Sequence, residues 1–315
     1  MKRDNYQNPE SEAVRADELL HQGCYDEAIL IYRALVEKFP EEDSHLLALA
    51  WACHDGGYEE EALKSFQDLF ARELERKVFS GFAFDELVRL YKQRGESDLL
   101  LDACERAVQA QGDDFALMGD LGDAYLRVNR FEDAIRIFGK MAVMEPDAAA
   151  VYCLLGNAYI LAGETAQGIA AYAEAIVIEP EKREAFLCRQ VETLRRAGAF
   201  SMAADALRQC LSERENPLLC LDLADLLIEM GDMEEGESLL RRAISLDPSS
   251  EGAYCNRLGN SLTRAGCHES AIACFQRAMR ADPTNPFYAM QLAAAYSAIG
   301  QEDVAARVRS GCGFS

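Results

Sequence analysis

The hydrophobic positions between residues 114 and 181 follow a helical spacing that repeats after 34 residues. In each copy a large residue precedes Leu-Gly and Tyr, and then come a small residue, an aromatic residue and Pro. The first copy consists of Met118, Leu121, Gly122, Tyr125, Ala134, Phe138 and Pro146, and the second of Tyr152, Leu155, Gly156, Tyr159, Gly168, Tyr172 and Pro180. Apolar residues at intervals of three and four predict amphipathic helices. The 34-residue period predicts a helix–turn–helix unit that recurs along the chain.

Each position of the pattern has an expected packing role. Gly156 beside Leu155 lets the second helix of the unit approach closely, and the small residue Gly168 does the same from the other side. The aromatic Tyr172 covers the next unit. Pro180 ends the second helix, because its ring and missing N–H disfavour continuation. One helix pair cannot bury its apolar face alone, so neighbouring pairs must stack.

This pattern resembles the tetratricopeptide repeat, and the resemblance extends over nearly the whole chain. It implies an all-α fold, a right-handed α-α superhelical solenoid of tandem helix-turn-helix repeats, as one domain over residues 9–310. The repeats are expected at about 9–42, 43–76, 81–114, 115–148, 149–182, 184–216, 217–250, 252–285 and 286–310. Residues 1–8 are polar and expected to be disordered, and residues 311–315 form a tail.

The clearest break in the repeat register lies between the second and third units. Residues 75–83 insert about four positions and, with the start of the third unit, place Phe79, Phe82 and Phe84 close together. Two interpretations are open. The rings form an apolar docking patch, because loops often carry function, or they pack beneath the neighbouring helices, which is the interpretation we favour.

The charge balance narrows the class of partner. The 315 residues carry 32 Lys and Arg against 54 Asp and Glu, a formal net charge of −22. Nucleic acids and anionic membranes would repel such a chain, so neither is expected as a partner. The charge favours basic partner proteins, although it also serves simply to keep a long helical protein soluble.

The sequence also indicates the cellular compartment of the protein. The N-terminus lacks the apolar core of a signal peptide, and no stretch reaches the 18 or so apolar residues that a membrane helix needs. Of the 11 cysteines, most occupy apolar packing positions, such as Cys104 and Cys255, and no Cys-x-x-Cys pair occurs. Such thiols indicate core residues in a reducing compartment. We expect a cytoplasmic protein.

The family resemblance also indicates where a partner would bind. In tetratricopeptide repeats the first helix of each pair usually lines the concave groove, and an asparagine after Leu-Gly often holds the backbone of a bound peptide, since one amide can both donate and accept. Asn157 and Asn260 occupy that position here. Asn256, Asn260 and Arg264 share one helix face, because they are spaced by four. The predicted partner-binding residues are Trp51, Asn157, Arg189, Asn256, Asn260 and Arg264.

The Lys-Asn clamp with which some family members grip chaperone tails does not align, because Ala13 and Asp17 stand in its first two places. No phosphate loop, zinc motif or nucleophile elbow occurs. We therefore expect no enzyme, no catalytic residue, no metal site and no cofactor. The leading hypothesis is a protein–protein interaction scaffold that binds a peptide or helix of a partner protein in its concave groove. The alternative is a self-assembling structural module that forms homo-oligomers.

Overall fold

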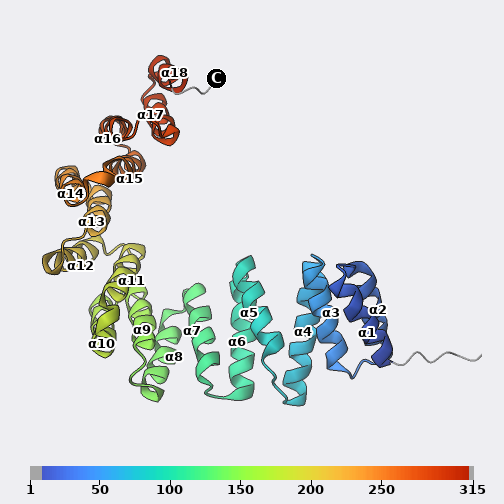
Figure 1. The fold of residues 1–315 in the computed structure, drawn as a ribbon. Helices are drawn as coiled ribbons and strands as arrows, with labels where there is room; N and C mark the ends of the chain where they lie inside the picture. Colours follow the sequence, from blue (N-terminus) through green and yellow to red (C-terminus); the bar gives the residue numbers. More distant parts are fainter. Residues whose placement is uncertain (1–8, 312–315) are drawn as a thin grey trace, which may run out of the picture. The chain divides into compact units, whose positions relative to one another are not determined.

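The computed structural model describes residues 9–311, and this part of the chain contains α-helices and two short 3-10 helices but no β-strand (Figure 1). The chain divides into two compact units, Met1–Val151 and Tyr152–Ser315, which we call unit 1 and unit 2. The predicted all-α arrangement of tandem helix pairs is confirmed.

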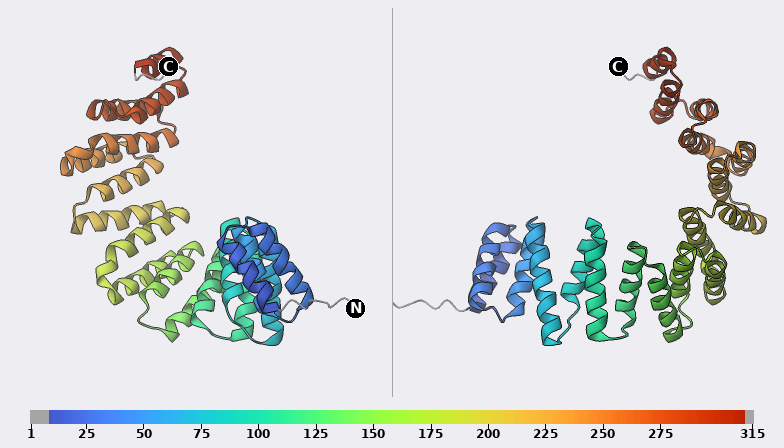
Figure 2. Two further views of the ribbon diagram at one scale, coloured as in Figure 1. Left: turned by 45° about the vertical axis from the view of Figure 1, so that its right-hand side comes forward. Right: turned by 180° about the vertical axis from the view of Figure 1, so that it is seen from behind.

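Unit 1 contains α1 (Pro9–His21), α2 (Tyr25–Lys38), α3 (Asp43–Asp55), α4 (Glu59–Arg76), α5 (Phe82–Arg94), α6 (Ser97–Gln111), α7 (Phe115–Arg127) and α8 (Phe131–Met144). Unit 2 contains most of α9 (Ala149–Leu161), then α10 (Thr165–Ile178), η1 (Pro180–Lys182), α11 (Arg183–Arg196), α12 (Phe200–Glu213), α13 (Pro217–Glu229), α14 (Met233–Leu246), η2 (Pro248–Ser250), α15 (Glu251–Arg264), α16 (His268–Ala281), α17 (Pro286–Ala298) and α18 (Glu302–Gly311). Within each unit the helices follow one another in chain order (Figure 2). Odd-numbered helices are the first of each pair, and α13 packs on the next first helix, α15.

A left-handed residue turns the chain between the two helices of every pair within residues 9–311. In eight pairs this residue is Gly with a positive φ, as in Gly163 (φ +88°), and in the pair α7–α8 it is Asn129 (φ 60°). Gly adopts this conformation without a Cβ clash, and Asn is among the few other residues that tolerate it. The turn residue therefore fixes the length of the first helix in each pair.

The core consists of the predicted packing positions. At most 1% of the surface is exposed in each of the aromatic residues Tyr32, Phe66, Phe138, Tyr172 and Phe275. The glycine after Leu lies against such a ring: a Cβ on Gly122 would come within 2.3 Å of the ring of Phe138. The small residue is thus required by the close approach of the two helices.

The insertion between α4 and α5 combines both interpretations offered from the sequence. The ring of Phe79 packs against Phe70 and Phe84, with centroids 6.2 and 5.8 Å away, and Phe84 is fully buried. Phe82, in contrast, is 67% exposed, as is Val78. The rings of Phe79 and Phe84 therefore belong to the core, whereas the ring of Phe82 forms part of an apolar surface.

Segment 1–8, which the sequence predicts to be disordered, and the predicted tail 311–315 apart from Gly311 lie outside the described residues. The repeat boundaries stay a prediction, because helix ends locate the turns and not the start of a repeating unit. Within residues 9–311 no helix is both long and apolar enough to cross a membrane.

Candidate partner-binding surface

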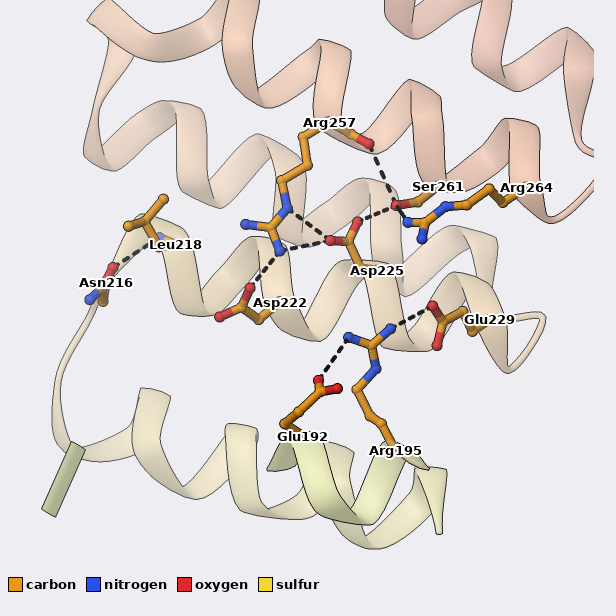
Figure 3. Close-up of polar contacts among 10 residues, drawn as sticks. All are labelled: Glu192, Arg195, Asn216, Leu218, Asp222, Asp225, Glu229, Arg257, Ser261 and Arg264. Atoms are coloured by element: carbon orange, nitrogen blue, oxygen red, sulfur yellow. Dashed lines mark hydrogen bonds and ion pairs between the residues drawn. The ribbon is translucent and has the colours of Figure 1, made fainter. Parts of the chain in front are cut away.

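A polar surface of unit 2 is built from three successive first helices, α11, α13 and α15. Helix α13 begins where Asn216 caps it: the side-chain oxygen of Asn216 accepts a hydrogen bond of 2.9 Å from the N–H of Leu218, and Pro217 follows the cap (Figure 3). Most of α13 is buried. Its polar stripe consists of Asp222, Asp225 and Glu229, which share one helix face because they are spaced by three and four.

Arg257 of α15 lies over this acidic stripe. Its Nε donates to Asp225 Oδ2 at 2.8 Å, and its Nη2 lies 2.7 Å from the same oxygen and also donates to Asp222 (Figure 3). Burial acts to lower the pKa of Arg257, but the hydrogen bonds and charges of Asp222 and Asp225 outweigh it and raise the pKa above its ordinary value. The guanidinium therefore stays charged and ties α15 to α13.

A second chain of hydrogen bonds reaches the same carboxylate. The hydroxyl of Ser261 donates to Asp225 Oδ1 at 2.6 Å, and Arg264 Nη2 donates to the Ser261 hydroxyl at 2.9 Å (Figure 3). Asp225 is only 6% exposed. A carboxylate buried to this extent needs such partners, since an unpaired buried charge is strongly destabilising.

On the other side of α13, Arg195 of α11 makes the matching contact. Its Nη2 donates to Glu229 at 2.6 Å, and Glu192 lies 3.9 Å from its Nη1 (Figure 3). The acidic stripe of α13 is thus flanked by arginines of both neighbouring first helices. We call this set, Arg195, Asp222, Asp225, Glu229, Arg257 and Ser261, the inter-repeat network.

Asn157 of α9 takes part in a similar bridge. Its side-chain oxygen accepts hydrogen bonds from the hydroxyl of the buried Tyr172 and, at 2.6 Å, from the hydroxyl of Thr193 on α11. Arg189 lies one turn before Thr193 and is exposed. Asn157 therefore already links two repeats, and its oxygen is engaged before any partner arrives.

The other predicted residues divide between the units. On α15, Asn256 and Asn260 are half-buried and Arg264 is exposed. Within residues 9–311 the oxygen of Asn256 has no hydrogen-bond partner although it is shielded from solvent. Trp51 lies in unit 1, where its ring meets Phe66 edge-on at 5.5 Å and remains 38% exposed. Asn157, Arg189 and the three residues of α15 thus lie on first helices of unit 2, whereas Trp51 belongs to unit 1.

Sequence reasoning missed the acidic half of this surface. Asp222, Asp225 and Glu229 on α13 pair with Arg195 and Arg257 of the neighbouring first helices. The partners are 32 to 36 residues apart, about one repeat length. Opposite charges at the repeat spacing on first helices were the signal that would have identified them.

The first helices of unit 1 carry a surplus of acid. Lys92 of α5 reaches two carboxylates of α7, Asp120 at 2.9 Å and Asp123 at 3.1 Å. Nearby, burial raises the pKa of Asp85, and the negative charges of Asp120 and Glu86 add to the effect. Negative charges in excess of their partners favour the approach of a cation.

The buried thiols have the properties of core residues. Burial raises the pKa of Cys104 and Cys274 to about 12, and that of Cys53, Cys153 and Cys255 to about 11. The nucleophilic thiolate is therefore disfavoured at these positions. In the part of the chain that the structure describes, no group of three or more His, Cys, Asp or Glu residues is arranged to hold a metal ion.

Known proteins share this repeat. Models of the tetratricopeptide repeat match residues 14–73, 120–182, 194–254 and 252–285, which together cover more than half of the chain. Tetratricopeptide repeat protein 21B of Mus musculus is 26% identical over 161 residues, which are 50% of this chain and 12% of that protein. The chain thus spans a small part of the length of that relative.

One solved structure supports the fold, and a second is less similar. A crystal structure of a tetratricopeptide repeat protein from Parabacteroides merdae is 13% identical with a TM-score of 0.52, over 80% of this chain and 98% of that chain. The crystal structure of the APC/C hetero-tetramer Cut9-Hcn1 is 14% identical with a TM-score of 0.38, over 99% of this chain and 75% of that chain. The chain therefore belongs to the tetratricopeptide repeat family, whose members are generally non-enzymatic scaffolds for protein–protein interaction.

Proposed function

We propose that this chain is a scaffold that binds an extended peptide or helix of a partner protein in a groove lined by the first helices α11, α13 and α15. One observation carries the proposal. The inter-repeat network pairs its own charges, whereas the amides of Asn256 and Asn260 on α15 have no hydrogen-bond partner among the described residues, the oxygen of Asn256 being shielded from solvent. An amide both donates and accepts, so it matches the alternating N–H and C=O groups of a peptide backbone.

The network supports binding by holding the surface in shape. Arg257 and Arg195 are fixed by carboxylates of α13, so a partner does not have to order these long side chains itself. Ordering such a side chain on binding costs about 0.5–1.5 kcal/mol. A pre-arranged face of this kind favours one binding mode, and the surplus of negative charge on the chain favours a basic partner. The buried thiols of Cys104 and Cys274 support a reducing compartment such as the cytoplasm.

The proposal is tested with the full chain and displayed 12-residue peptides. Peptides are selected for binding to the wild type, and calorimetry then measures their affinity for the wild type and for the double variant Asn256→Ala/Asn260→Ala. Gln209→Ala is the control, because Gln209 is an exposed amide on the second helix α12. Two lost hydrogen bonds of about 0.5–1.5 kcal/mol each should weaken binding about fivefold to 150-fold. The control should bind as the wild type does.

Two results would overturn the proposal. Unchanged affinity in the double variant would place the peptide on another surface. A mass that grows with protein concentration in light scattering, without any peptide present, would instead favour the self-assembling module. Asn157→Ala is unsuitable as the test, because its oxygen joins α9 to α11 and its loss would disturb packing.

A further inference from the structure

Unit 1 contains a cavity of about 360 Å³ between the start of α3, the end of α4 and the segment that leads into α5. Its apolar wall consists of Leu47, Leu69, Val78 and Phe82. Val78 and Phe82 are each 67% exposed, so the cavity opens to solvent along the insertion that breaks the repeat register. An apolar side chain from outside could reach this wall without displacing any helix.

One charged group in the wall is incompletely paired. Glu73 of α4 is only 7% exposed, and its Oε1 accepts a hydrogen bond from the hydroxyl of Ser80, which also lines the cavity. Its other oxygen, Oε2, is shielded from water and has no hydrogen-bond partner within residues 9–311. A buried acceptor without a partner is costly, and more so if it is charged. The carboxylate therefore has the capacity for one further donor.

The nearest arginine of the wall is engaged elsewhere. Arg76 donates through Nη1 to Asp43 at 2.6 Å and through Nη2 to Glu41 at 2.8 Å. Its guanidinium thus pairs with two other carboxylates, and within residues 9–311 no group donates to Glu73 Oε2.

We propose that this cavity binds a lysine side chain presented by a basic segment of a partner protein. The four-carbon stem of lysine would pack on Leu47, Leu69 and Phe82, and its ammonium would donate to Glu73 once a rotation of that side chain turns the shielded Oε2 towards the cavity. Long charged side chains commonly bury their stems along apolar surface in this way. A single available oxygen suits the compact ammonium better than the two-pronged guanidinium of arginine, which binds carboxylates best through both oxygens. The net charge of −22 attracts basic segments to the chain.

The lysine cavity is separate from the face of α11, α13 and α15. Its lining comes from α3, α4, α5 and the segment before α5, all in unit 1. Either site can therefore fail in its test while the other stands.

The test compares two probes that differ only in charge: Nα-acetyl-lysine N-methylamide and Nα-acetyl-norleucine N-methylamide. Binding to the full chain is followed by NMR of the methyl groups of Leu69 and Val78. We expect saturable shifts with the lysine probe at an affinity about tenfold higher than with the norleucine probe. In Glu73→Gln the two affinities should differ by less than about twofold, whereas Glu75→Gln, an exposed carboxylate on the same helix, should keep the tenfold preference.

Phe82→Ala gives an independent reading should Glu73→Gln fail to fold. Removing this exposed ring should weaken both probes by a similar factor, since it forms part of the apolar wall. Equal affinities for the two probes in the wild type would overturn the proposal. So would a lysine preference that survives in Glu73→Gln, or shifts that do not saturate.

Discussion

A methyl group added at Gly122 tests the argument that the small residue of each first helix is required by close packing. A Cβ at this position would lie 2.3, 2.5 and 3.0 Å from three atoms of the Phe138 ring. Carbon atoms in contact normally lie about 3.5–4.0 Å apart, so the ring or the helix would have to move by roughly 1 Å. Phe138 is fully buried and lies in a packed interior.

The same repeat provides a matched control. Gly139 of α8 follows Phe138 in the chain, and a Cβ there would have no atom within 4 Å other than its own neighbours. Both positions are helical, so Gly→Ala gains about 1 kcal/mol of helix propensity at each. At Gly122 the overpacking cost of about 1–3 kcal/mol opposes this gain. Gly122→Ala should therefore be about 1–3 kcal/mol less stable than Gly139→Ala, which itself should be more stable than the wild type.

Urea unfolding of the three proteins, followed by circular dichroism, measures this difference. Long repeat arrays can unfold in more than one step, so hydrogen exchange of the amides of α7 and α8 provides a local measurement. Protection there should fall in Gly122→Ala and rise in Gly139→Ala. If Gly122→Ala proves as stable as Gly139→Ala, the ring adjusts at no cost and the close-packing argument is wrong.

Three further predictions concern a helix cap, a carboxylate and the thiols. Asn216→Ala should cost about 1 kcal/mol, because it removes the cap of α13, and hydrogen exchange in the first turn of that helix should accelerate. Hydrogen bonds from Ser249 and adjacent hydroxyls lower the pKa of Asp247 from 3.8 to about 2. Its stabilising contribution should therefore be present above pH 4 and be lost as the pH falls towards 2. The free energies of unfolding of Asp247→Asn and of the wild type, measured across that range, should converge at low pH. Iodoacetamide at pH 8 should modify the exposed Cys188 in the native chain, whereas buried Cys104 (pKa about 12) should be modified only after urea unfolding, as mass spectrometry can determine. Early modification of Cys104 would mean that α6 opens readily.

The fold was predictable because the information for it is local. Aromatic residues such as Tyr172 and small residues such as Gly156 recur at the same places in several repeats, and each repeat packs mainly on its neighbours. The 34-residue period therefore identifies which residues meet without any knowledge of distant contacts. Even the irregular turn at Asn129 keeps the spacing of the glycines around it.

The candidate surface was predictable only in part. The period placed Asn157, Asn260 and Arg264 on first helices, and the structure agrees. It could not tell whether their polar atoms were available. Asn157 turned out to be engaged by Thr193, whereas Asn260 has no partner among the described residues. Whether such a polar atom is already hydrogen-bonded depends on how the side chains of the neighbouring repeat are oriented. The pattern within one repeat carries no information on that orientation.

The sequence by itself determined that the chain is a stack of helix pairs with thiols and aromatic rings in its core, because helical periodicity and small residues at fixed spacing leave few other ways to bury that surface. Only the tertiary structure decided which buried charges are fully paired. Asp225 is nearly buried yet paired by Arg257 and Ser261, whereas Glu73 is nearly buried with one oxygen unpaired. The physical reason is that hydrogen bonds act over about 3 Å and depend on direction, so they follow from the final positions of side chains on adjacent repeats and not from the residue types alone.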